Sequence, residues 1–186
     1  MTARAAYVFD FDSTLVDFET LDILAERSLD GRSDADAVRA EIAALTDQAM
    51  SGALGFGEAL SRRLALLPLT RGHVAELAGR AVKRLTPSVV RNLAFFRENA
   101  GRVVIVSGGL REVIAPVAAH LGVSPHHVLA NDLIYDGQGR VTGVAAANPL
   151  SRTGGKAEAL RALGLDGPVV MVGDGSYLML NSEIAT

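Results

Sequence analysis

The chain has 186 residues, of which 49% are hydrophobic and 21% are charged, with a formal net charge of -3 and no cysteine. These values are ordinary for a globular protein with a sizeable core, and they exclude disulfides, thiolate metal sites and a cysteine nucleophile. The chain has no long run of one charge sign, which argues against nucleic acid or an anionic membrane as a partner. Because no apolar run is long enough to span a bilayer and the N-terminus lacks a signal-peptide pattern, we expect a cytoplasmic protein.

The first predicted element is a buried strand over residues 6–9, a short apolar run that ends at Asp10. From Phe18 to about Leu85 the apolar residues recur with helical spacing, which predicts a bundle of short helices inserted after this strand. The predicted organisation is a helical cap domain over residues 17–85 and a catalytic core formed by residues 1–16 and 86–186.

Beyond Pro87 the pattern alternates between helix and strand. The predicted elements are a helix over 88–99, a strand over 102–106, a helix over 110–121 with a kink at Pro116, a weak strand over 127–130, a hairpin over 133–144, a helix over 155–163 and a strand over 169–172. Such alternation is typical of an α/β fold with a Rossmann-like, mostly parallel sheet that helices cover on both faces.

Distinctive polar clusters follow the predicted parallel strands. The carboxyl ends of parallel strands form the ligand crevice of an open α/β sheet, so we expect these clusters to converge there. They are Asp10 with Asp12, the segment Ser107-Gly108-Gly109, Lys156 with the loop before it, and Asp174.

This set of side chains suits phosphoryl transfer. Asp10 could bind a hard cation and attack an electrophile, while Asp12 protonates the leaving oxygen and later activates water. Asp174 would complete, with Asp10 and Asp12, an oxygen-ligand site suited to Mg²⁺. The hydroxyl and free N–H groups at Ser107 and Gly108, together with Lys156, would compensate phosphate charge. Each motif alone is more often a turn, a helix start or a solvated charge, and only their order at successive strand ends favours catalysis.

The same four motifs resemble those of the haloacid dehalogenase-like phosphatases, most closely the phosphoserine phosphatases, over roughly residues 5 to 175. The resemblance implies that the helical insertion is a substrate-selecting cap. It implies further that Glu19 holds the substrate amino group, that Met50 and Phe56 are apolar cap positions, and that Arg63 binds the substrate carboxylate. Glu19 and Arg63 also have ordinary structural readings, as a first-turn helix carboxylate and as one of two adjacent arginines on a solvated helix face.

The sequence after Gly175 departs from the family. Tyr177 and Leu178 stand where the family has an asparagine that touches phosphate and an aspartate that orients metal-bound water. Loss of an aspartate that orients metal-bound water typically costs about 10–100-fold in metal affinity or activity. The segment from Gly173 to Ile184 instead resembles the start of the thiamine-diphosphate motif of a trihydroxycyclohexanedione hydrolase. We therefore expect a foreign tail, missing final core elements, and an exposed sheet edge that promotes self-association.

The preferred interpretation is Mg²⁺-dependent hydrolysis of phosphoserine through an aspartyl-phosphate at Asp10, with a small phosphorylated metabolite as partner. Three alternatives stay open at this point. They are a phosphatase of another small phosphomonoester, an inactive fragment that binds Mg²⁺ or phosphate or only self-associates, and a thiamine diphosphate protein.

Overall fold

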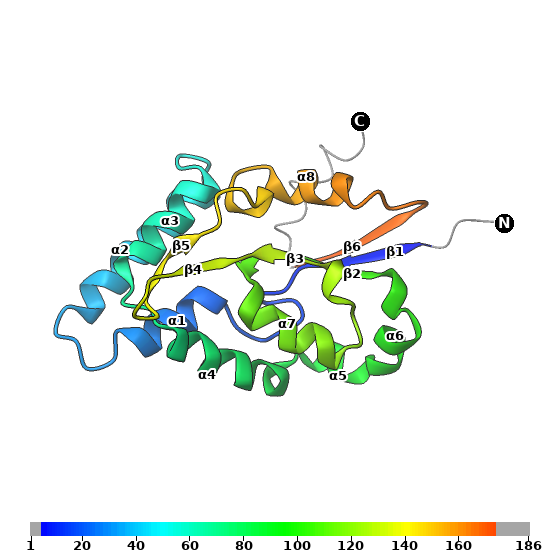
Figure 1. Cartoon of the computed structure of the whole chain (residues 1–186), viewed down its shortest axis with the longest axis horizontal. Coiled ribbons are helices and arrows are strands. Elements are labelled where there is room, and N and C mark those ends of the chain that lie inside the picture. The colour runs from blue at the N-terminus through cyan, green and yellow to red at the C-terminus, as the bar shows by residue number, and fades with distance from the viewer. Residues whose placement is uncertain (1–4, 174–186) are drawn as a thin grey trace.

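The computed structural model describes residues 5–173 (Figure 1). Its centre is a four-stranded parallel sheet in the order β3-β2-β1-β6. The strands are β1 (Ala6–Phe9), β2 (Val103–Leu110), β3 (Val128–Asn131) and β6 (Val169–Val172). In the register of the sheet, Val8 lies opposite Val104 on one side and Met171 on the other. The α/β fold with a parallel sheet, predicted from the alternating pattern, is confirmed.

Helices cover both faces of this sheet (Figure 1). On one face lie the short helices α5 (Pro87–Arg91) and α6 (Leu93–Glu98) and the longer α7 (Arg111–His120), and on the other lies α8 (Gly155–Ala162). Successive strand residues point to opposite faces. Phe9 and Ile105 therefore join the core toward α7, while Val8, Val104 and Val106 join a smaller core with Leu160 of α8.

The helices that the apolar spacing predicted after β1 are present as four α-helices between β1 and α5. They are α1 (Thr20–Ser28), α2 (Ala35–Met50), α3 (Phe56–Leu66) and α4 (Arg71–Ala81). Each buries an apolar stripe, represented by Leu24, Ile42, Leu60 and Leu77 in that order. These residues belong to the same hydrophobic cluster as Phe9 and Ile105 of the sheet. The helical insertion thus shares the main core of the sheet, and its separation as a domain over 17–85 stays a prediction.

Element boundaries after Pro87 differ from prediction by more than one residue at two places. The helix predicted over 88–99 is divided into α5 and α6 at Asn92, whose side-chain Nδ2 donates to the carbonyl of Ser88 at 2.8 Å. Strand β2 continues through Gly108 and Gly109 to Leu110, where its register with β3 becomes irregular. Short 3-10 helices fill several connections, namely η1 (Val82–Arg84), η2 (Ala100–Arg102), η3 (Pro125–His127) and η4 (Pro149–Ser151).

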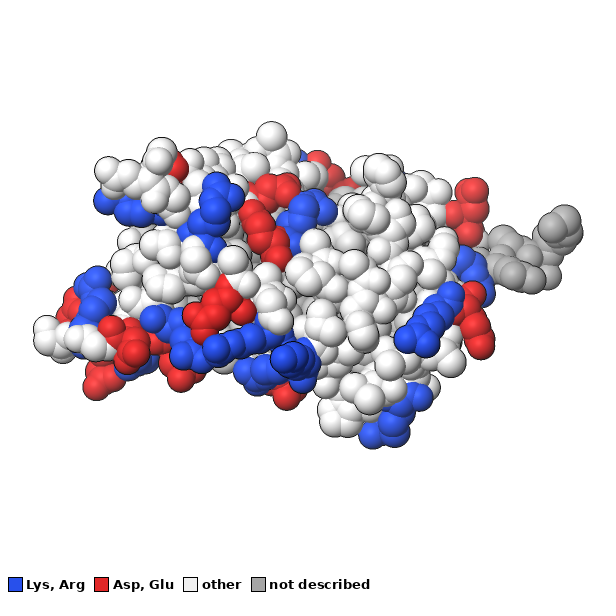
Figure 2. Space-filling model, turned by 60° about the horizontal axis from the view of Figure 1, so that its bottom comes forward, with Lys and Arg blue, Asp and Glu red and all other residues white. Residues whose placement is uncertain are grey.

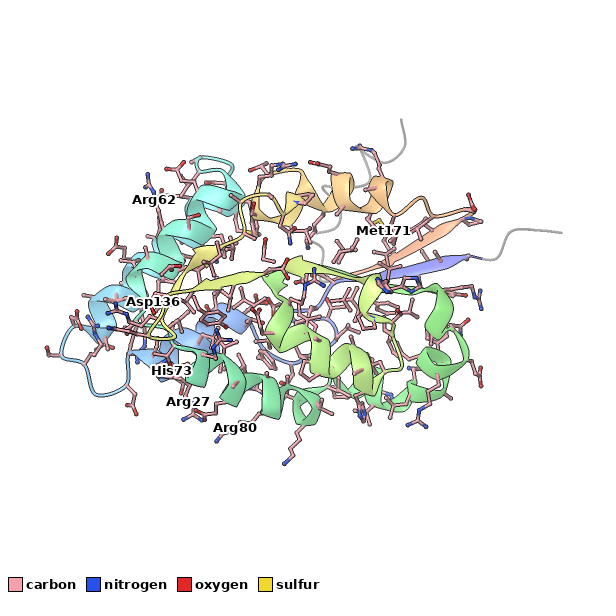
Figure 3. The ribbon with its side chains drawn as sticks, viewed as in Figure 1. Arg27, Arg62, His73, Arg80, Asp136 and Met171 are labelled. Carbon is pink, nitrogen blue, oxygen red and sulfur yellow. The ribbon has the colours of Figure 1, made fainter. Side chains whose placement is uncertain are left out.

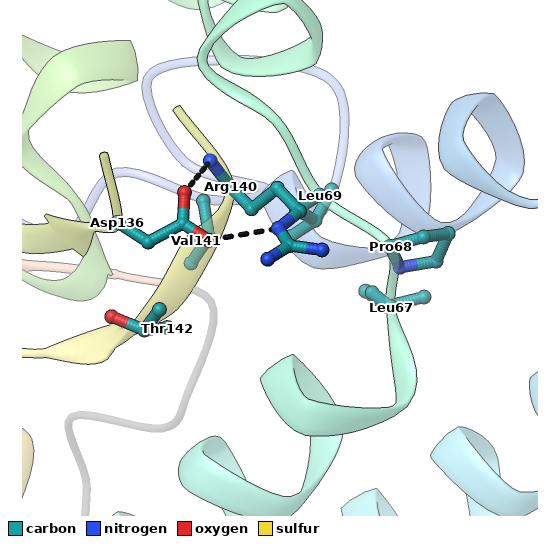
Figure 4. A pocket seen from close by; sticks show the side chains of 7 residues that line it. All are labelled: Leu67, Pro68, Leu69, Asp136, Arg140, Val141 and Thr142. Atoms are coloured by element: carbon teal, nitrogen blue, oxygen red, sulfur yellow. Dashed lines mark hydrogen bonds and ion pairs between the residues drawn. The ribbon is translucent and has the colours of Figure 1, made fainter. Parts of the chain in front are cut away.

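A separate antiparallel hairpin, β4 (Leu133–Tyr135) and β5 (Val141–Val144), projects toward the helical insertion. Its outer strand pairs with the segment before α4, because the N–H of Val141 donates to the carbonyl of Leu69 at 2.9 Å. A pocket of about 370 Å³ lies where the two segments meet, lined by residues 67–69, Asp136 and residues 140–142 (Figure 4). None of the predicted site residues lines this pocket.

Strand β6 lies at one edge of the described sheet. Val169, Val170 and Val172 are 38%, 44% and 38% exposed, whereas Met171 packs into the smaller core beneath α8 (Figure 3). The predicted self-association through this edge stays a prediction. The tail after Gly175, with its resemblance to a thiamine diphosphate enzyme, lies outside the described residues.

Basic and acidic side chains are interspersed on the face shown in Figure 2, over helices of the insertion and the core. Ion pairs of opposite charges occur among the described residues, as between Glu76 of α4 and Arg27 at 3.8 Å and Arg80 at 3.1 Å. This face therefore carries no extended field of one sign of the kind that favours nucleic acid. Among the described helices, none combines the length and the apolar character needed to cross a membrane.

Candidate active site

Asp10 stands directly after β1, at the carboxyl end of the sheet. Its Oδ2 pairs with Nζ of Lys156 at 2.5 Å, and its Oδ1 accepts the N–H of Phe11 at 2.8 Å. Its own N–H donates to the carbonyl of Val172 at 2.9 Å, which continues the β1–β6 ladder. The side chains of Asp10 and Lys156 are 9% and 25% exposed, so solvent screens this ion pair only weakly. Two predicted site residues 146 positions apart thus meet.

Asp12 lies beside this pair and is held by the start of α1. Its Oδ1 accepts hydrogen bonds from the backbone N–H of Thr20 at 3.1 Å and from the Thr20 hydroxyl at 2.5 Å. Burial raises the pKa of Asp12 from 3.8 to about 7; the charges of Glu19 and Asp10 act in the same direction, and the Thr20 hydrogen bonds oppose them. A carboxyl with a pKa near neutrality can both donate and accept a proton at physiological pH.

The segment Ser107-Gly108-Gly109, near the carboxyl end of β2, brings backbone groups to the same place; because the register with β3 shifts here, we call it the Ser107–Gly109 turn. Ser107 is 2% exposed, and its Oγ accepts the N–H of Gly109 at 2.9 Å. A Cβ placed on Gly109 would lie 3.4 Å from Oδ2 of Asp12, so the turn and the carboxylate are in contact distance. The predicted convergence of the first two motifs is therefore present.

Phe56, at the first position of α3, closes over this turn from the helical insertion. A Cβ on Gly108 would lie 2.5 Å from Cζ of the Phe56 ring, so only glycine fits there with the ring in place. The backbone N–H of Phe56 also donates to Oγ1 of Thr153 at 3.0 Å, in the loop before α8. The insertion thus contacts both the Ser107–Gly109 turn and the loop that leads to Lys156.

Arg63 of α3 lies within electrostatic range of Asp22 and Glu19, at the start of α1. Burial lowers the pKa of Arg63, and the negative charges of Asp22 and Glu19 oppose that shift. The Arg63 guanidinium donates to the carbonyl of Ala59 at 3.3 Å and to the hydroxyl of Thr46 at 3.4 Å. Glu19 is exposed at the start of α1, next to the loop that carries Asp12.

Met50 is placed differently from Phe56. It is the last residue of α2 and is 68% exposed, so its side chain makes little contact with the described protein. Its role as an apolar substrate contact stays a prediction.

Several residues of this site were not singled out from the sequence. Ser13 donates from its hydroxyl to Oε1 of Glu19 at 2.6 Å and has φ of +50°, the only positive φ of a non-glycine residue within 5–173. Thr20, Asn131 and Thr153 also bond to site elements. The hydroxyl of Thr20 at a predicted helix start is a signal that could have been used, whereas the other contacts depend on tertiary structure.

The carboxylates fit a hard divalent cation by their chemistry, since Mg²⁺ prefers oxygen ligands and is bound through one or two carboxylates. Asp10 and Asp12 supply such oxygens at the end of β1. Within residues 5–173 no group of three or more acidic or histidine side chains is placed to hold a metal. The third predicted ligand, Asp174, lies outside the described residues, so the described part holds two of the three.

The chain is similar to proteins whose names point to phosphoserine phosphatases. The chloroplastic phosphoserine phosphatase of Arabidopsis thaliana is 34% identical over 174 residues, covering 92% of this chain and 56% of that protein. A phosphoserine phosphohydrolase-like protein from Francisella tularensis has a crystal structure that superposes with a TM-score of 0.81 at 26% identity, covering 96% of this chain and 83% of that one.

A structure described as a phospho-aspartyl intermediate analogue of phosphoserine phosphatase is 32% identical with a TM-score of 0.55, covering 76% of this chain and 62% of that one. The chain thus spans a little more than half the length of the plant relative. A family model described as haloacid dehalogenase-like hydrolase matches residues 7–177. The chain belongs to the haloacid dehalogenase-like hydrolase family.

Proposed function

We propose that the chain is a Mg²⁺-dependent phosphatase that hydrolyses O-phosphoserine to serine and inorganic phosphate through an aspartyl-phosphate at Asp10. The observation that carries the proposal is the contact of the Asp10 carboxylate with Lys156, next to Asp12 and the Ser107–Gly109 turn. The names of the relatives support the substrate class, and the phospho-aspartyl analogue supports the intermediate.

In the first step an oxygen of Asp10 attacks phosphorus, and the bond from phosphorus to the serine oxygen breaks. The protonated carboxyl of Asp12 gives its proton to that leaving oxygen; in the metal-free protein burial raises the pKa of this carboxyl to about 7. Lys156 balances charge on the transferring group, with the turn at Ser107 as a further source of polar contacts. The product of this step is serine and phosphorylated Asp10.

In the second step water attacks the phosphorus of the phosphorylated Asp10. Asp12, now a carboxylate, takes the proton from that water, and the bond from phosphorus to the Asp10 oxygen breaks. Phosphate leaves and both carboxyls return to their starting states. Bound Mg²⁺, held by Asp10 and Asp12 and by Asp174 as a predicted third ligand, would supply charge compensation for the phosphate throughout.

Substrate choice rests on Glu19 and Arg63. An ammonium group would bind the exposed carboxylate of Glu19, and a carboxylate would bind the Arg63 guanidinium. A second candidate, a phosphatase of a different small phosphomonoester, is favoured by one observation: Arg63 already bonds to Ala59 and Thr46. The self-association expected from the exposed edge of β6 and a cytoplasmic location remain parts of the proposal.

The test is phosphate release from phosphoserine, phosphoethanolamine and 3-phosphoglycerate, with Mg²⁺ or with EDTA. Phosphoethanolamine lacks the carboxylate and 3-phosphoglycerate lacks the ammonium, so each removes one proposed contact. We expect turnover of phosphoserine that Asp10→Asn and EDTA both abolish, and that the control Asp17→Asn keeps, because Asp17 is exposed and pairs with Arg84. A folded wild type without turnover on any substrate would support the inactive fragment, and a preference for phosphoethanolamine or 3-phosphoglycerate would support the second candidate.

A further inference from the structure

Asn131, the last residue of β3, connects two segments of the site without touching the reacting groups. It is fully buried. Its Nδ2 donates to the carbonyl of Gly108 at 2.8 Å and to the carbonyl of Leu150, in η4, at 3.1 Å. Both partners are acceptors, which fixes the orientation of the amide, because only the nitrogen of the side chain can donate.

The first of these bonds acts on the Ser107–Gly109 turn. The Gly108 carbonyl and the Gly109 N–H belong to one rigid peptide plane. Asn131 holds the carbonyl end of that plane, and Ser107 Oγ accepts from the N–H end at 2.9 Å. The bond also lies in the part of β2 where the register with β3 is irregular, so a side chain supports the strand there. The orientation of the turn therefore depends on Asn131.

The second bond acts on the segment before Lys156. A Cβ on Gly155 would lie 1.8 Å from the carbonyl oxygen of Pro149 and 3.0 Å from Cα of Leu150, so the start of α8 rests directly on η4. Lys156 is the next residue and reaches Asp10. Holding the Leu150 carbonyl therefore holds the base from which Lys156 extends.

We propose that Asn131 is a positioning residue that sets the spacing between the Ser107–Gly109 turn and Lys156, the two elements that receive the phosphate. The inference rests on the proposed function and adds a residue to it. One nitrogen with two hydrogens spans the two carbonyls, which neither a carboxylate nor an apolar side chain can do. Among the described residues Asn131 makes its side-chain hydrogen bonds through Nδ2, to the carbonyls of Gly108 and Leu150.

The test measures the affinity of the full chain for inorganic phosphate with Mg²⁺ by calorimetry, alongside kcat and KM for phosphoserine and the melting temperature. Asn131→Asp places oxygen against two carbonyls, and Asn131→Leu removes both bonds. The matched control is Asn99→Leu, because Asn99 bonds to Phe95 at the end of α6. We expect both Asn131 variants to weaken phosphate binding by about ten- to a hundredfold, the loss that small misplacements typically cause. We expect Asn99→Leu to change only the melting temperature.

Folded Asn131 variants that bind phosphate as the wild type does would overturn the proposal. If both variants fail to fold, the test is the NMR signal of the side-chain amides in the wild type. Added phosphate should shift the Asn131 signal and leave the Asn99 signal in place. An Asn131 signal that does not move overturns the proposal. A wild type that binds phosphate without hydrolysing phosphoserine refutes the proposed function alone. A wild type that does not bind phosphate refutes the role of Asn131.

Discussion

Asp12→Asn should change how the stability of the metal-free protein depends on pH. The folded state raises the pKa of Asp12 from 3.8 to about 7, so the folded protein holds a proton that the unfolded chain has released. The contribution of Asp12 to stability is therefore fully present below pH 3.8 and is lost as the pH rises through about 7. At about 1.36 kcal/mol for each pKa unit, the full loss is about 4 kcal/mol, an upper bound for a group near solvent.

The measurement is urea unfolding of wild type and Asp12→Asn in EDTA at several values between pH 4 and pH 8.5. Asparagine keeps the acceptor for Thr20 and does not titrate, so the stability of the variant relative to the wild type should rise with pH. Asp136→Asn is a control that should stay constant over this range. Hydrogen bonds from Arg140 and Gln138 lower the pKa of Asp136, so its contribution to stability is lost only as the pH falls below 3.8. The reasoning would be refuted if the free energy of unfolding of Asp12→Asn, relative to that of the wild type, stayed constant or fell with rising pH.

Three further outcomes are expected. Thr20→Val removes a hydrogen bond that lowers the pKa of Asp12, so the carboxyl should titrate above about 7 when followed by carbon-detected NMR, and an unchanged midpoint would contradict the assigned contact. Gly57→Ala places a Cβ 2.1 Å from the Ser151 carbonyl oxygen, so it should raise KM for phosphoserine. The overpacking should also lower the free energy of unfolding, measured in urea, by about 1–3 kcal/mol. Leu110→Ala empties a fully buried position and should lower the free energy of unfolding by about 2–5 kcal/mol, and a loss below 1 kcal/mol would mean that the site collapses around the smaller side chain.

Local patterns predicted the elements that depend on local sequence. The strands over 6–9 and 169–172 occur at the predicted residues, because short apolar runs bounded by polar or turn residues leave little choice. The division at Asn92 was missed, since it depends on a side chain that bonds back to the Ser88 carbonyl and competes with the helix.

The order of the polar motifs along the chain, each after a predicted strand, was enough to predict which of them meet in the site. Asp10, Asp12 and the turn at Ser107 converge as that rule requires, and Lys156 reaches Asp10. Asn131 could not be found this way, because its role depends on two carbonyls brought together only by the folded chain. No local sequence signal identifies which buried amide will connect two loops.

The contacts of Phe56 join the helical insertion to the core beside the candidate site. While the ring lies against Gly108 and its N–H bonds to Thr153, the insertion and the core are joined over the Ser107–Gly109 turn. Helix α4 packs extensively on α7, and α3 contacts β5 and η4, so the insertion is joined to the rest of the chain at several further places. If these contacts must open during turnover, the frequency of opening, which for such motions lies on the microsecond to millisecond scale, would be a ceiling on both substrate entry and phosphate escape.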